Sequence, residues 1–202
     1  MDHLVYGAPD VEVASAAVAG ALGVTPALGG RHVGLGTYNH LLSFGDGSYL
    51  EIIGVDLRWV DVTGPRPFGV DHLDQPKLVA WAWRVDGLDA AVERAREAGW
   101  DPGDPIDLRR ETPDGGELRW RLTLLRPELA GIVPFLIDWG GSAHPSTTAP
   151  GGATLAGFEL VHPDVDAVQR ALAAIGATAA VAPGPVPGLR ARLTGPAGRM
   201  NL

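Results

Sequence analysis

The sequence predicts an α+β protein built from tandem βαβββ modules, each with one strand, one helix and three further strands. The main observation is a threefold repeat of an apolar run, an acidic or proline turn, a small-residue amphipathic stretch and a glycine. The copies open at Asp2, Leu78 and Leu155. Their turn residues are spaced by 77 positions, at Pro9, Asp86 and Pro163. A repeat of this length carries a whole supersecondary module. A second observation is that runs of alternating polarity flank Asp-Gly turns, as in paired strands.

The first module, residues 1–56, is expected to contain a strand, a helix and a strand hairpin. Asp10 has the residue type of a helix N-cap, and Gly23 has that of a C-terminal stop. Asp46-Gly47 is a strong hairpin signal between two alternating runs. The predicted elements are a strand at 3–7, a helix from 10 to about 22, and hairpin strands at 38–44 and 49–53.

Residues 57–76 form a connector with three prolines, and its length is typical of a lid over a site. The second module, residues 77–140, repeats the plan. Its predicted elements are a strand at 78–85, a helix at 88–98, and strands at 106–111, 118–125 and 133–139. A glycine-rich linker, residues 141–152, leads to a partial third module at 153–202, with a strand, a helix at about 164–175 and a hairpin near 195–198. We expect all of these parts to form one compact domain.

Composition excludes several function classes. The net charge of −8 and a single lysine, Lys77, argue against binding to a nucleic-acid backbone. Cysteine is absent, which excludes disulfides, zinc–thiolate sites and a cysteine nucleophile. No apolar run approaches the ~20 residues that span a bilayer, so we expect no membrane partner. No basic leader precedes the first strand, so we expect a cytoplasmic protein.

Several stretches resemble the glyoxalase-like domain family of the vicinal-oxygen-chelate superfamily, which includes glyoxalase I, extradiol dioxygenases and bleomycin-binding proteins. They are DHLV, GRHVGLGTYNHLLSFGDGSYLEIIG, PFGVDHL and PFLIDWGGSAHP. The resemblance implies that paired modules curve their sheets into a cup with helices outside. It also implies up to four metal ligands, from the first and last strands of each module, and Lewis-acid chemistry on a carbonyl-bearing substrate.

Two of the four ligand positions carry suitable residues. The first strand offers His3, and the last strand of the first module offers Glu51, a pair that suits Zn, Fe, Mn, Ni or Co. By the repeat offset, Ala80 is the equivalent of His3 in the second module. By alignment of the last strands, Ile137 is the equivalent of Glu51. Neither can bind a metal, so the sequence favours a site without metal.

His40 is a candidate third ligand, and its position depends on the hairpin loop. If Asp46-Gly47 closes a two-residue turn, Leu42 pairs with Glu51, and His40 then lies on the same sheet face as Glu51. A bulge or a three-residue loop would turn His40 away.

Glu51 also has roles that need no metal. It could act as a general base on an acidic C–H, with His3 as a hydrogen-bonding or acid partner. Alternatively, it could form an ion pair with an arginine, for which Arg84, Arg119 and Arg121 are candidates. The expected ligand-binding residues are Asn39, Trp59, Arg84 and Trp120. Because Trp120 alternates with Arg119 and Arg121, either the tryptophan or the two arginines face the cavity.

Two function classes remain. The first is an enzyme of the lyase, isomerase or dioxygenase type that acts on a small carbonyl-bearing or apolar metabolite. The second is a small-molecule-sequestering protein like the antibiotic-binding relatives, and the apolar positions Ala80 and Ile137 favour it or a metal-free enzyme. An interaction domain without a small ligand is a third interpretation. The incomplete third module also favours a homodimer.

Overall fold

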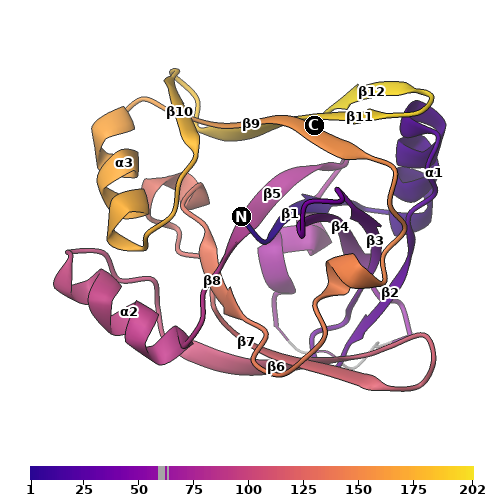
Figure 1. Ribbon diagram of the computed structural model, residues 1–202, viewed down its shortest axis with the longest axis horizontal. Coiled ribbons are helices and arrows are strands. Elements are labelled where there is room, and N and C mark those ends of the chain that lie inside the picture. The colour runs from indigo at the N-terminus through magenta and orange to yellow at the C-terminus, as the bar shows by residue number, and fades with distance from the viewer. Residues whose placement is uncertain (59–61, 63) are drawn as a thin grey trace.

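The computed structural model describes residues 1–58, 62 and 64–202. The first two modules close into one barrel with the strand order β1-β4-β3-β2-β6-β7-β8-β5 (Figure 1). The first module consists of β1 (His3–Gly7), α1 (Val11–Leu22), β2 (Ala27–His32), β3 (Thr37–Ser43) and β4 (Tyr49–Val55). The second consists of β5 (Lys77–Arg84), α2 (Leu88–Glu97), β6 (Pro105–Glu111), β7 (Glu117–Thr123) and β8 (Phe135–Asp138). The α+β class and the tandem βαβββ plan are therefore confirmed, and the expected cup is a closed barrel.

The two halves meet along two antiparallel strand pairs, β1 with β5 and β2 with β6. His3 pairs with Ala82 across the first seam. His3 also pairs with Tyr49, the first residue of β4, and Ala82 pairs with Phe135, the first residue of β8. Because β4 and β8 are the last strands of their modules, Ala82 is the counterpart of His3 in the second half. The expectation that Ala80 holds this position was wrong by two residues. A shift of two keeps the side-chain direction, because the strand period is two.

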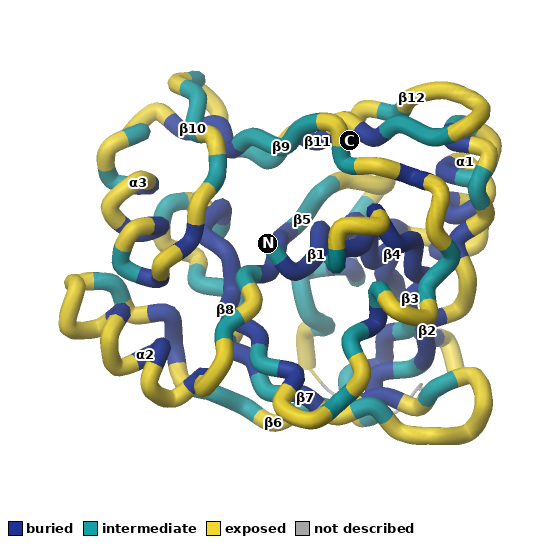
Figure 2. The backbone as a smooth tube through the Cα atoms, viewed as in Figure 1, coloured by how far each residue is buried: buried dark blue, intermediate teal, exposed yellow. Residues whose placement is uncertain are grey.

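Alternation along the barrel strands separates two cores. Inward side chains gather in the barrel interior, and outward side chains pack beneath the helices and the third module. The inward set includes Val5, Leu41, Ile53, Ala80, Ala82, Leu122 and Ile137. The outward set includes Leu4, Leu42, Leu50, Ile52, Trp81 and Leu136. Figure 2 shows the barrel strands β1 and β4 as buried, whereas α2 and α3 turn exposed faces outward.

The ends of helix α1 follow from its sequence. The side chain of Asp10 accepts a hydrogen bond from the backbone N–H of Val13 at 3.0 Å, which satisfies one free donor of the first turn. Gly23 ends the helix in the left-handed conformation, with φ 75°, which an L residue adopts only at a cost. The helix thus begins and ends where the sequence predicts.

The third copy has the same element order but forms its own sheet. It consists of β9 (Thr154–His162), α3 (Val165–Ala174), β10 (Ala180–Pro183), β11 (Gly188–Gly195) and β12 (Gly198–Asn201), in the strand order β10-β9-β11-β12. Phe158 packs on Trp81 with ring centroids 5.1 Å apart, so this sheet covers the outer face of the barrel. All five elements of a module are present, and β10 and β12 are short, with four residues each. No helix of the described residues is long and apolar enough to cross a membrane.

Three short 3-10 segments complete the part of the chain that the structure describes. They are η1 (Pro67–His72) in the connector, η2 (Glu128–Gly131) before β8, and η3 (Pro145–Thr147) in the linker. Pro65 to Phe68 line the barrel cavity, so this part of the connector covers it, as a lid would. The linker is tied to the end of the barrel, because the N–H of Ser43 donates to the carbonyl of Pro150 at 2.8 Å.

Candidate functional site

The barrel encloses a cavity of 590 Å³. Its aromatic wall consists of Tyr49, Phe68, Trp120, Phe135 and Trp139. Its polar wall consists of His3, His32, Thr37, Asn39, Glu51 and Arg110. The polar side chains come mainly from the first module, and the apolar ones mainly from the second. Sites for small organic molecules commonly combine an apolar cavity with a few convergent polar groups.

Glu51 lies at the centre of the polar wall and is 7% exposed. The amide of Asn39 donates a hydrogen bond to its Oε1 at 2.6 Å. The Nε2 atom of His3 lies 3.6 Å from Oε2, and the Nε2 atom of His32 lies 3.7 Å from Oε1. Both contacts are too long for good direct hydrogen bonds, so the two imidazoles and the carboxylate face one shared space.

Asp2 fixes the orientation of His3. Its buried carboxylate accepts hydrogen bonds from His3 Nδ1 at 2.6 Å, His144 Nε2 at 2.9 Å and Trp139 Nε1 at 3.0 Å. Burial alone would raise the pKa of Asp2, but the hydrogen bonds from His144 and His3 outweigh it and hold the pKa well below its usual value. Because an ionised carboxylate only accepts, His3 carries its proton on Nδ1 and turns Nε2 toward the cavity.

His32 is a neutral cavity group. Its Nδ1 atom lies 2.9 Å from the hydroxyl oxygen of Thr37, and its side chain is almost fully buried. Burial lowers the pKa of His32 to about 4, although the charge of Glu51 acts in the opposite direction. Burial also raises the pKa of the neighbouring Tyr49, with added effects from Asp2 and Glu51. Both groups are therefore uncharged near neutral pH.

Arg110 adds a positive charge to the same wall. Its Nη1 atom donates to Asn39 Oδ1 at 2.9 Å, so Asn39 links Arg110 to Glu51. Burial lowers the pKa of Arg110, while Tyr49 and Glu51 act to raise it. Gly29 makes room for this linkage, because a Cβ atom there would lie 2.4 Å from both Arg110 Nη1 and Asn39 Oδ1.

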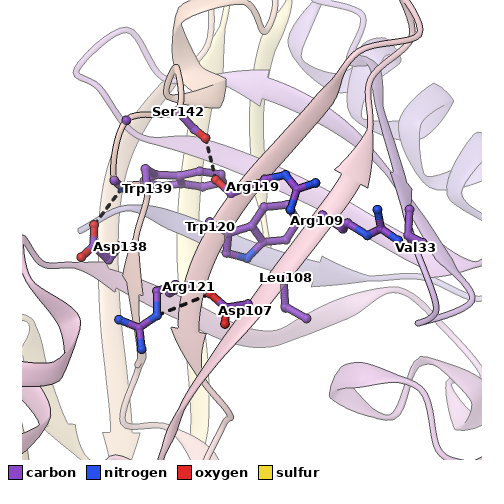
Figure 3. Close-up of a pocket in the computed structure, with 12 residues that line it drawn as sticks. Val33, Asp107, Leu108, Arg109, Arg119, Trp120, Arg121, Asp138, Trp139 and Ser142 are labelled. Carbon is purple, nitrogen blue, oxygen red and sulfur yellow. Dashed lines mark hydrogen bonds and ion pairs between the residues drawn. The ribbon is translucent and has the colours of Figure 1, made fainter.

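A second hollow of 620 Å³ lies next to the cavity (Figure 3). Trp120 and Trp139 line both spaces. Arg121 belongs to the outer hollow and pairs with Asp89 at 2.6 Å. Arg119 pairs with Glu117 and is largely exposed. Trp120 therefore faces the cavity, the two arginines face outward, and neither is bonded to Glu51.

His40 lies on the opposite face of the sheet, which corrects its expected place beside Glu51. Leu41, not Leu42, pairs with Glu51, and His40 pairs with Ile52. The cause is a three-residue loop, because Phe44 N–H bonds the carbonyl of Ser48 across Gly45-Asp46-Gly47. A register shift of one residue reverses every side chain of a strand. His40 instead contacts Ser15 Oγ at 3.0 Å and Glu12 at 3.3 Å, both on α1.

The other expected site residues divide into two groups. Asn39 and Trp120 line the cavity with His3 and Glu51. Arg84 lies outside it, partly exposed, with Nε 3.7 Å from Asp2. Trp59 lies outside the described residues. His32 and Arg110 were not among the expected site residues. Arg110 lies in the expected strand at 106–111, whereas His32 lies in a glycine-rich run that gave no such signal.

The donor set does not fit the chelated divalent metal that the family resemblance implies. In the second half, the counterparts of His3 and Glu51 are Ala82 and Ile137, which offer no ligand atom. One oxygen of Glu51 is already bonded to the amide of Asn39. Within residues 1–58, 62 and 64–202, no group of three or more His, Cys, Asp or Glu side chains is arranged to hold a metal ion.

Comparisons with known proteins agree with this fold. The model of the glyoxalase-like domain matches residues 1–176. No curated protein matches the chain. A hypothetical protein from Staphylococcus aureus has a TM-score of 0.64 at 14% identity, over 99% of this chain and 84% of that chain. A hypothetical protein from Bacillus halodurans C-125 has a TM-score of 0.50 at 14% identity, over 71% and 96%.

Methylmalonyl-CoA epimerase from Mycobacterium tuberculosis has a TM-score of 0.45 at 18% identity, over 69% of this chain and 87% of that chain. At these identities the structural likeness concerns the fold alone. The alignment with the Staphylococcus aureus protein extends over the third module as well as the barrel.

Proposed function

This chain belongs to the glyoxalase-like domain family, and we propose that it is a lyase or isomerase that binds a small carbonyl-bearing molecule in its barrel. The proposed step is proton transfer at the carbon next to the carbonyl. The observation that carries the proposal is Glu51, a carboxylate inside an apolar cavity with Asn39 and two imidazoles around it. A carboxylate so placed is suited to act as a general base.

In the proposed step, a carboxylate oxygen of Glu51 takes the proton of the C–H bond. The electron pair of that bond moves into the carbon–carbon bond, and the carbonyl electrons move onto oxygen, which gives an enolate. Glu51 then returns the proton to the face of the carbon from which it was taken, and the carbonyl group forms again. Asn39 holds Glu51 Oε1 at 2.6 Å, which leaves Oε2 as the oxygen that faces His3 and the cavity.

His3 is the proposed acid partner of Glu51. Asp2 holds the proton of His3 on Nδ1, so its Nε2 atom faces the reacting space 3.6 Å from Glu51. At that distance one substrate oxygen or one water molecule can lie in contact with both groups. Protonated on Nε2, His3 can donate to the enolate oxygen, and Asp2 stabilises the imidazolium that this requires.

Hydrogen–deuterium exchange tests the proposal. Phenylpyruvate and phenylacetone each have a C–H group between a phenyl ring and a carbonyl, and their exchange in D₂O can be followed by proton NMR. We expect the protein to accelerate exchange of at least one of them, and Glu51→Gln to reduce the enzymatic rate at least ~100-fold. His40→Ala is the matched control and should leave the rate unchanged. Exchange that survives in the Glu51→Gln variant would overturn the assignment.

A non-catalytic sequestering protein is the second candidate, and the aromatic wall favours it. Phe68, Phe135, Trp120 and Trp139 offer stacking surfaces to a planar ligand, and a ring needs no proton transfer to bind. If the same compounds bind without exchange, the sequestering function replaces the enzymatic one.

A further inference from the structure

We infer that Arg110 is the anchor for a carboxylate group of the ligand, so that the barrel takes an organic acid with an apolar or aromatic body. The inference rests on the proposed function only for the cavity as the ligand site. It adds a charged recognition group that proton transfer at Glu51 does not require. The starting observation is a buried guanidinium that lines an otherwise largely apolar space.

Arg110 is 5% exposed, and within the described part of the chain its side chain makes one hydrogen bond, to the neutral amide oxygen of Asn39 at 2.9 Å. Among the described residues, no carboxylate oxygen lies within 4.0 Å of its nitrogen atoms. The cavity carboxylate Glu51 is not a direct partner of Arg110, because the carboxamide of Asn39 bridges the two side chains. A buried charge is normally paired, because leaving it unpaired costs much of its solvation energy.

The residues around Arg110 hold its guanidinium in position to bind a ligand. Arg110 enters from β6 through the gap that Gly29 leaves, and Asn39 fixes one edge of the guanidinium. The remaining N–H groups are available to the cavity, because no other hydrogen-bond partner is found among the described residues. The planar fork of arginine matches the two oxygens of a carboxylate.

The apolar wall of the cavity indicates the chemistry of the rest of the ligand. Trp120, Leu122 and Phe135 face the cavity from the second module. A carboxylate on Arg110 would place an attached ring or chain along this apolar wall, with the carbon chain next to Glu51. A neutral ligand would leave Arg110 without a counter-charge, which is why an acid is inferred.

Phenylacetate and phenylacetamide form the test pair, because they share size and ring and differ in charge. Isothermal titration calorimetry should show that the wild-type protein binds phenylacetate at least tenfold more tightly than the amide. Arg110→Met should abolish this preference and leave amide binding in place. Arg110→Lys keeps the positive charge but not the planar guanidinium, so it should retain part of the preference for phenylacetate. Arg119→Met, at the exposed outer surface, is the control and should keep the full preference.

Several results would overturn the inference. These are equal affinity for acid and amide in the wild type, a preference that persists in Arg110→Met, or no binding of phenylacetate at millimolar concentration. If Arg110→Met does not fold, as judged by circular dichroism, Arg110→Lys and Arg110→Gln decide by the same ratio. Glu51→Gln separates the two proposals. If this variant keeps the preference for the carboxylate, the role of Arg110 is supported. If the wild type then shows no proton exchange, only the proposed catalysis fails.

Discussion

The carboxylate of Asp2 lies 2.6 Å from the Nδ1 atom of His3, its neighbour in the chain. The same carboxylate accepts from Trp139 at the end of β8 and from His144 in the linker. Two parts of the chain that are far apart in sequence, the start of β1 and residues 139–144, therefore converge on one buried charge. This convergence orients His3 and also ties the linker to the end of the barrel.

Asp2→Asn should lower the free energy of unfolding by about 3 kcal/mol at pH 7, because it removes a buried charge that three donors share. The pKa of Asp2 is lowered in the folded state, so its contribution is present above about pH 4 and is lost as the pH falls further. The variant should therefore show a weaker loss of stability in acid. Urea denaturation at pH 7 and pH 3 measures both effects, and Asp74→Asn, at an exposed position, is the control. An unchanged acid response in Asp2→Asn would contradict this role.

His32 should make stability depend on pH in a different range. Its pKa is about 4 in the folded state against 6.5 as the ordinary value, so between these values the unfolded chain binds more protons. The free energy of unfolding should therefore fall as the pH drops from 6.5 to 4, by up to about 3 kcal/mol from this group. His32→Gln should flatten that part of the curve, measured by urea denaturation at half-unit pH steps. The same slope in both proteins would show that His32 is not the titrating group.

The element order and the inward direction of the site residues could be predicted from local patterns. The Asp10 cap and the Asp46-Gly47 turn are short-range signals, and each lies at a boundary between elements. His3 and Glu51 were expected in one hollow, and the structure brings them within 3.6 Å. Side-chain direction alternates within each strand, so an error of two residues in the expected counterpart leaves the predicted direction correct. This is the case for Ala80, which was expected in the place that Ala82 holds.

Register and closure of the barrel could not be predicted in the same way. His40 was misplaced because the loop after β3 has three residues between Phe44 and Ser48, and sequence alone does not distinguish this from a two-residue turn. His32 and Arg110 meet only through the β2–β6 seam, where the two residues pair. That seam joins segments nearly 80 residues apart, and no local signal specifies it.

His40→Ala tests the corrected position of this residue. Because His40 contacts Ser15 and Glu12 of α1, the variant should lose about 1 kcal/mol of stability, which is the usual value of one hydrogen bond. Its affinity for phenylacetate should be unchanged, since the side chain does not line the cavity. His32→Ala is the matched comparison and should change that affinity by about tenfold, because His32 is part of the wall. If calorimetry shows instead that His40→Ala changes the affinity for phenylacetate and His32→Ala does not, His40 lies beside Glu51 as first expected.

Gly29→Ala tests whether the space beside Arg110 and Asn39 matters. A Cβ atom at Gly29 would lie 2.4 Å from one atom of each side chain, so both side chains must shift away from it. We expect a loss of about 1–3 kcal/mol of stability from the strain, together with a loss of the preference for phenylacetate over its amide. Gly20→Ala is the matched control, because a Cβ atom there meets nothing within 4 Å. In the interior of helix α1 that change should instead stabilise the protein by about 0.5–1 kcal/mol and leave the preference intact. If Gly29→Ala keeps the full acid preference, the hydrogen bond from Arg110 to Asn39 is not what positions the guanidinium.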